Sequence, residues 1–120
     1  MRSITNESDF NVDNGFFAVK FWSTWCQPCK AFAPKVASLD EEFNDVDFIS
    51  IDIDQVPSLA QKYKVRSLPT LLIIENGNEV NRIEGLQLIA PMRKILRDLT
   101  NSQPEQENEK VQPVRKISAD

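Results

Sequence analysis

The sequence predicts one α/β domain over residues 1–101, followed by a polar, disordered tail over residues 102–120. Two observations support this fold class. Apolar residues switch between strand-like and helix-like spacing, in the order strand, helix, strand, helix, strand, strand, helix. The chain has 120 residues, of which 41% are apolar, which suffices for one modest core and not for two. The tail carries two prolines and no aromatic residue, so it lacks the side chains that build a core.

The first half of the domain is predicted to contain a short opening helix, a strand and a long helix. An amphipathic segment over residues 4–12 suits the opening helix, and the nearly continuous apolar run over residues 16–22 is typical of a strand covered on both faces. Pro28 suits the first turn of the long helix, because its missing N–H has no partner there, whereas Pro34 should kink that helix. Apolar residues then recur on one helical face at Phe32, Val36, Leu39 and Phe43.

Three further elements follow the long helix. Residues 46–54 alternate isoleucine with polar side chains, and a period of two is typical of a strand. A short helix is predicted over residues 57–63. The apolar run over residues 71–74 then predicts another strand.

The end of the domain is predicted to be a hairpin and a helix. Asn76 and Gly77 form the dipeptide most typical of a two-residue hairpin turn, which sends residues 79–83 back antiparallel. Gly85 marks the turn that follows. Apolar side chains over residues 88–99 then share one face of a last helix.

The composition excludes several kinds of site. The chain has no histidine, which rules out histidine nucleophile relays, histidine bases and histidine metal ligands. Two cysteines cannot complete a zinc or iron–sulfur site within one chain, so we expect no metal. The net charge is −4 and the 14 Lys and Arg residues are scattered, which argues against a nucleic-acid partner.

The sequence also indicates where the protein works. Its first residues lack the apolar stretch of a secretory signal, and no apolar run is long enough to span a membrane. We therefore expect no membrane partner and a cytoplasmic location. In a cytoplasm a cysteine pair is more often reactive or metal-binding than a permanent cross-link.

Cys26 and Cys29 form a C-x-x-C pair where the first predicted strand meets the long helix. The free N–H groups of a helix N-terminus favour a thiolate, so we expect Cys26 to act as the nucleophile. We also expect Cys26 to be exposed. Cys29 lies one turn further on, where its thiol can attack a mixed disulfide at Cys26 and release the substrate. The alternatives are half of a zinc site shared with a partner and an inert structural disulfide.

The sequence around this pair resembles the thioredoxin family over residues 4–99. The resemblance is carried by Pro34, by the hairpin dipeptide and Gly85, and by the segments Phe-Trp-Ser-Thr-Trp-Cys-Gln-Pro-Cys-Lys (21–30), Asp-Gln-Val-Pro (54–57) and Tyr-Lys-Val-Arg-Ser-Leu-Pro-Thr (63–70). It implies the thioredoxin fold, with a central mixed sheet of about five strands flanked by about four helices. It also implies a cis peptide before Pro69 and an apolar rim for extended substrate chains.

The rim positions of the family match Trp25, Pro28, Leu68 and Gly85, and with Pro69 they form the predicted substrate-binding surface. Trp22 and Trp25 have the alternative of being core aromatic residues.

The sequence departs from the family at two positions near the cysteines. Gln27 stands where glycine is usual, and Lys20 stands where the family typically carries a buried aspartate that takes a proton from the second cysteine. A buried Lys20 must be neutral or paired, and Asp52 on the next strand is its expected partner. We therefore expect Lys20, Gln27, Pro28 and Asp52 to tune the redox pair.

The resemblance implies a thiol–disulfide oxidoreductase that reduces protein disulfides. Its partners would be disulfide-containing client proteins and a thioredoxin reductase that supplies electrons from NADPH, and the chain itself would be a monomer that binds no cofactor. The alternative is a thioredoxin-fold binding module or assembly subunit with secondary redox activity. A net oxidant or isomerase is disfavoured, because it would be an exported protein.

Overall fold

The computed structural model describes residues 1–101, and the predicted tail over residues 102–120 lies outside them. Met1–Ile89 form one compact unit, and a second begins at Ala90. In chain order the elements are β1 (Arg2–Ile4), the 3-10 helix η1 (Glu7–Asp9), β2 (Phe16–Trp22), α1 (Gln27–Glu42), β3 (Asp47–Asp52), α2 (Pro57–Lys62), β4 (Thr70–Glu75), β5 (Asn78–Glu84) and α3 (Ile89–Asn101).

The predicted mixed sheet of about five strands is confirmed, and its strands lie in the order β1-β3-β2-β4-β5. β1, β3 and β2 are parallel, whereas β4 and β5 run antiparallel. The hairpin between β4 and β5 turns at Asn76 and Gly77, which have φ of 50° and 85°. Positive φ at both central residues is what the predicted turn requires, and glycine adopts it without a steric cost.

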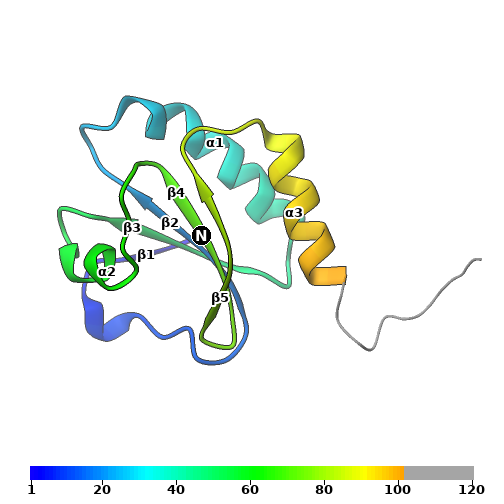
Figure 1. Cartoon of the computed structure of the whole chain (residues 1–120), viewed down its shortest axis with the longest axis horizontal. Coiled ribbons are helices and arrows are strands. Elements are labelled where there is room, and N and C mark those ends of the chain that lie inside the picture. The colour runs from blue at the N-terminus through cyan, green and yellow to red at the C-terminus, as the bar shows by residue number, and fades with distance from the viewer. Residues whose placement is uncertain (102–120) are drawn as a thin grey trace, which may run out of the picture. The chain divides into compact units, whose positions relative to one another are not determined.

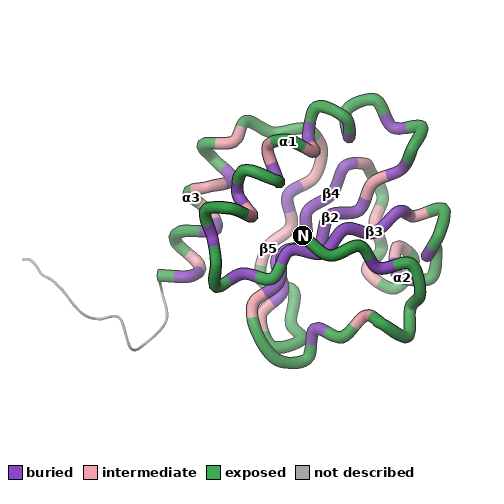
Figure 2. Tube along the Cα trace, turned by 180° about the vertical axis from the view of Figure 1, so that it is seen from behind, coloured by how far each residue is buried: buried purple, intermediate pink, exposed green. Residues whose placement is uncertain are grey.

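Each face of the sheet carries a different helix of the first unit (Figure 1). Leu59 of α2 belongs to the core cluster on the face that holds Val19, Phe21 and Ile51. α1 lies over the other face. Along β2 and β3, the side chains of Lys20 and Ser50 point to this face, because they alternate with the core residues of the first face. Figure 2 shows that the buried chain is concentrated in β2, β3 and β4. The start of α1 therefore lies over the most buried part of the sheet.

Three α-helices are present in residues 1–101, so the expectation of about four was wrong. The missing one is the opening helix, which is reduced to the single turn η1. Ile4 pairs with Ile51 in the sheet and is buried, which leaves few residues for a helix. Asn6 caps the turn by accepting from the Ser8 N–H, and the chain is extended again at Phe10.

The described part of the second unit, up to Asn101, belongs to α3. The predicted last helix is confirmed, and its buried side chains are Met92, Leu96 and Thr100. Lys94 and Asp98 form an ion pair between neighbouring turns, with their atoms 2.7 Å apart.

Candidate active site

Cys26 and Cys29 are joined by a disulfide at the N-terminus of α1. Cys26 is the N-cap residue of this helix, and its Sγ accepts a hydrogen bond from the Cys29 N–H at 3.2 Å. No acidic residue lies in the first helical turn. After reduction, this N–H and the helix N-terminus both favour a thiolate at Cys26.

The two cysteines are almost equally buried, with 5% of Cys26 and 6% of Cys29 exposed. The expectation of an exposed Cys26 was therefore wrong, because the N-cap residue of α1 is buried in the folded chain. The cysteines differ in the hollow that each lines. Cys26 lines an open groove of about 460 Å³, whereas Cys29 lines a second cavity of about 240 Å³. A substrate in the groove would meet Cys26.

Trp25 forms one wall of the groove and is 65% exposed, so it is not a core residue. Its Nε1–H donates a hydrogen bond of 2.9 Å to Oδ2 of Asp54, in the turn that follows β3. Asp54 was not among the predicted site residues, although it opens one of the segments that carry the family resemblance. Gln27 and Pro28 are exposed and line the same groove, so they lie at its rim.

The opposite wall of the groove comes from the segment that precedes β4. Val65, Arg66, Ser67 and Leu68 line the groove there. The predicted cis peptide between Leu68 and Pro69 is confirmed. The carbonyl of buried Pro69 accepts a hydrogen bond of 2.8 Å from the N–H of Gly85, so the structure brings these two predicted residues together.

The cavity at Cys29 also contains Lys20, which is only 9% exposed. The Lys20 Nζ lies 5.9 Å from the ring centroid of Trp22, which also lines the cavity. Burial lowers the pKa of Lys20. The structure thus brings Lys20 and Cys29 to one cavity, as the sequence led us to expect.

The expected ion pair between Lys20 and Asp52 is absent from residues 1–101, so that prediction was wrong. The register of the parallel strands places Ser50 opposite Lys20 and puts Asp52 opposite Trp22. The Asp52 side chain instead accepts a hydrogen bond of 2.9 Å from the Asp54 N–H. Asp52 therefore shapes the turn that presents Asp54 to Trp25.

We expect Asp54→Ala to raise the KM for a protein disulfide about two- to tenfold with little change in kcat, because one hydrogen bond that orients Trp25 is lost. Asp54→Asn is the matched control, since it keeps an acceptor oxygen without the charge. Steady-state kinetics of all three proteins would test this. Equal KM values for wild type and Asp54→Ala would show that this hydrogen bond does not prepare the groove.

The thioredoxin family model matches residues 3–98 of the chain. The chain is 39% identical over 93 residues to a thioredoxin of Staphylococcus epidermidis, covering 75% of this chain and 89% of that protein. It is 38% identical over 88 residues to thioredoxin-2 of Pyricularia oryzae; this match covers 71% of the chain and 52% of the relative, so the chain spans about half of that protein.

Solved structures agree with these matches. Mitochondrial thioredoxin 3 of Saccharomyces cerevisiae superposes with a TM-score of 0.74 at 28% identity, covering 82% of this chain and 94% of that one. The thioredoxin of Fasciola hepatica superposes with a TM-score of 0.72 at 35% identity, covering 81% of this chain and 98% of that one.

Proposed function

The chain belongs to the thioredoxin family of thiol–disulfide oxidoreductases, and on that premise we propose that it reduces disulfides of client proteins through Cys26 and Cys29. The observation that carries this proposal is the disulfide itself, which caps α1 and has one cysteine on an open groove. Within residues 1–101 no cluster of His, Cys, Asp and Glu could hold a metal ion, and a redox role needs none.

The proposed reaction begins with the pair reduced. The Cys26 thiolate attacks one sulfur of the client disulfide, a mixed disulfide forms, and the other client sulfur leaves as a thiolate that takes up a proton. The Cys29 thiol then gives up its proton and attacks the Cys26 sulfur. This step releases the second client thiol and forms the Cys26–Cys29 disulfide, so two electrons have passed to the client.

The arrangement of the groove supports a protein chain as the substrate. Trp25, Pro28 and Leu68 offer apolar surface, and the segment before β4 runs along the other side of the groove. We assign client contact to these residues and to Pro69 and Gly85, which share a hydrogen bond just beyond the groove. An extended client segment can pair its main chain with such an exposed segment.

We further propose that a thioredoxin reductase using NADPH restores the dithiol and that the chain works as a monomer without a bound cofactor. None of the helices in residues 1–101 is long and apolar enough to cross a membrane. A net reductant fits a reducing compartment, so we propose a cytoplasmic location. The family match ends at residue 98, which supports a redox domain over residues 1–101.

Reduction of insulin disulfides, followed as precipitation of the freed chains, tests the proposed function. With excess dithiothreitol as electron source, catalytic amounts of the protein should accelerate precipitation over dithiothreitol alone. The matched control is the same protein with both thiols alkylated after reduction, which should add nothing. If the unmodified protein adds no rate either, the proposed activity is wrong.

A further inference from the structure

One wall of the active-site groove belongs to a segment that is basic, although the whole chain has a net charge of −4. Between Gln55 and Ile74 the sequence has no Asp or Glu, but it has Lys62, Lys64 and Arg66. All three are exposed, and Arg66 lines the groove together with Cys26. A client that reaches Cys26 therefore passes close to this concentration of positive charge.

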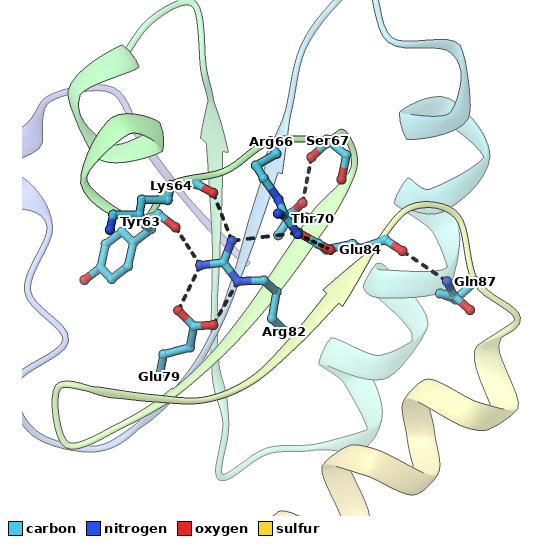
Figure 3. Close-up of polar contacts among 9 residues, drawn as sticks. All are labelled: Tyr63, Lys64, Arg66, Ser67, Thr70, Glu79, Arg82, Glu84 and Gln87. Atoms are coloured by element: carbon cyan, nitrogen blue, oxygen red, sulfur yellow. Dashed lines mark hydrogen bonds and ion pairs between the residues drawn. The ribbon is translucent and has the colours of Figure 1, made fainter.

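Arg82 of β5 holds this segment in place (Figure 3). Its guanidinium donates hydrogen bonds to the carbonyls of Tyr63 at 2.5 Å and Lys64 at 3.2 Å. Glu79 accepts two hydrogen bonds from Arg82, at 2.8 and 2.9 Å, and these hydrogen bonds raise the pKa of Arg82. The segment is thus bonded to the sheet through its backbone, which leaves the side chains of Lys62, Lys64 and Arg66 on the surface.

The nearby acidic groups do not cancel this charge. Glu79 is engaged by Arg82, and Glu84 is shared by Arg66 at 3.3 Å and Arg82 at 3.9 Å. Neither Lys62 nor Lys64 forms an ion pair within residues 1–101. Asp13 also acts electrostatically on Tyr63, which lies among these cations. Four cations thus face three carboxylates, which still leaves a surplus of positive charge.

These side chains surround a hollow of about 410 Å³, the basic pocket, lined by Lys62, Tyr63, Lys64, Arg66, Glu79 and Arg82. Arg66 also lines the groove at Cys26, so the basic pocket and the groove meet at this residue. The side chain of Arg66 is 78% exposed, so it can contact a ligand on either side while it is paired with Glu84.

We propose that the basic pocket binds carboxylate side chains of the client, so that preferred clients carry Asp or Glu next to the cysteine that Cys26 attacks. This inference rests on the proposed function and adds a class of substrate to it. Asp54 is hydrogen-bonded to Trp25, which forms the other wall of the groove, so groups of opposite charge flank the groove on its two sides. A client with an acidic residue towards Arg66 gains an attraction, whereas a basic residue there meets repulsion.

Three peptides that share one sequence and one disulfide, with Glu, Gln or Lys beside the cysteine, test this inference. At low salt we expect kcat/KM to fall in the order Glu, Gln, Lys, with about three- to tenfold between the extremes, mainly through KM, because exposed ion pairs are weak. The spread should shrink at high salt, because salt screens such pairs. Arg66→Glu should abolish or reverse the order.

Arg2→Glu is the matched control, since Arg2 is another exposed arginine in an ion pair, with Asp47, on the edge strand β1. It makes the same change in net charge and should leave the order of the peptides intact. Equal kcat/KM for the Glu and Lys peptides would overturn the inference. A loss of preference in Arg2→Glu as large as in Arg66→Glu would also overturn it, because the effect would then come from net charge alone.

Binding of the same peptides with alanine in place of cysteine separates the two proposals. Amide NMR shifts of residues 62–66 should move more with the Glu peptide than with the Lys peptide, whether or not the disulfides are reduced. If no peptide is reduced but this difference appears, the proposed function fails and the basic pocket stands. If all peptides are reduced and the shifts are equal, the basic pocket is wrong and the function stands.

Discussion

Cys26→Ser should abolish disulfide reduction, whereas Cys29→Ser should trap the client as a mixed disulfide. A serine hydroxyl is not ionised at neutral pH, so Cys26→Ser has no nucleophile on the groove. In Cys29→Ser the first attack still occurs at the N-cap of α1, but no thiol remains at the second cavity to release the client. Turnover should stop after one adduct per protein molecule.

Mass spectrometry and non-reducing gels after incubation with disulfide-bonded insulin would measure these adducts. The double serine variant is the control for adducts that do not involve either thiol. A dithiothreitol-sensitive adduct on Cys26→Ser and none on Cys29→Ser would reverse the assigned roles. Alkylation of the reduced wild type gives an independent check, because iodoacetamide should modify Cys26 before Cys29.

Lys20→Asp should raise the pKa of Cys26 and make the reduction potential more negative. Lys20 and Cys29 line one cavity, where the Lys20 Nζ lies over the Trp22 ring, a contact that favours the protonated amine. A protonated amine there favours the thiolates of the reduced pair, whereas a carboxylate disfavours them. A differential stabilisation of about 1.4 kcal/mol corresponds to about 30 mV for this two-electron couple, so a shift of that order is expected. The wild-type pair should thus be the more oxidising of the two.

Thiolate absorbance against pH and equilibration with glutathione would measure both quantities. Lys20→Met removes the charge while keeping the length of the side chain, and should shift the potential in the same direction by less. Lys30→Met is the matched control, because Lys30 lines the same cavity but is exposed to solvent, where its charge is screened. An unchanged or more positive potential in both Lys20 variants would contradict the role of Lys20.

The free energy of unfolding should depend on pH because the amine of Lys20 is buried. Burial lowers the pKa of Lys20, so between its folded and unfolded pKa values the unfolded chain binds more protons. The free energy of unfolding of wild type relative to Lys20→Met should therefore rise with pH through that window. Comparison of the two proteins also cancels the contribution of Tyr63, whose pKa is raised by its burial. A difference in the free energy of unfolding between the two proteins that stays constant with pH would contradict the prediction.

Much of the fold and the chemistry could be predicted from short-range patterns in the sequence. The hairpin at Asn76 and Gly77 was identifiable because its backbone conformation is imposed by the two residues themselves. The position of Cys26 at a helix N-terminus follows from an apolar strand that changes to helical spacing within a few residues. The cis peptide at Pro69 was predictable from the family resemblance alone, because local preference favours trans.

The opening segment and the surroundings of Lys20 depended on contacts between distant residues. A local amphipathic pattern predicted a helix over residues 4–12, but pairing of β1 with β3 draws Ile4 into the sheet. Which polar residue lies opposite Lys20 depends on the register of β2 and β3. That register selects Ser50, and a shift of two positions would be needed to place Asp52 there.

The sequence by itself therefore determined the reactive pair, its helix and the succession of elements from residue 16 onward, since each is encoded in residues close together along the chain. Only the tertiary structure decided what surrounds the pair. Trp25 is hydrogen-bonded to Asp54, and Arg82 is hydrogen-bonded to the carbonyls of Tyr63 and Lys64. These hydrogen bonds join residues that are 18 to 29 positions apart. Such contacts depend on how the sheet aligns its strands and on the loops that leave it, and side-chain periodicity carries no information about either.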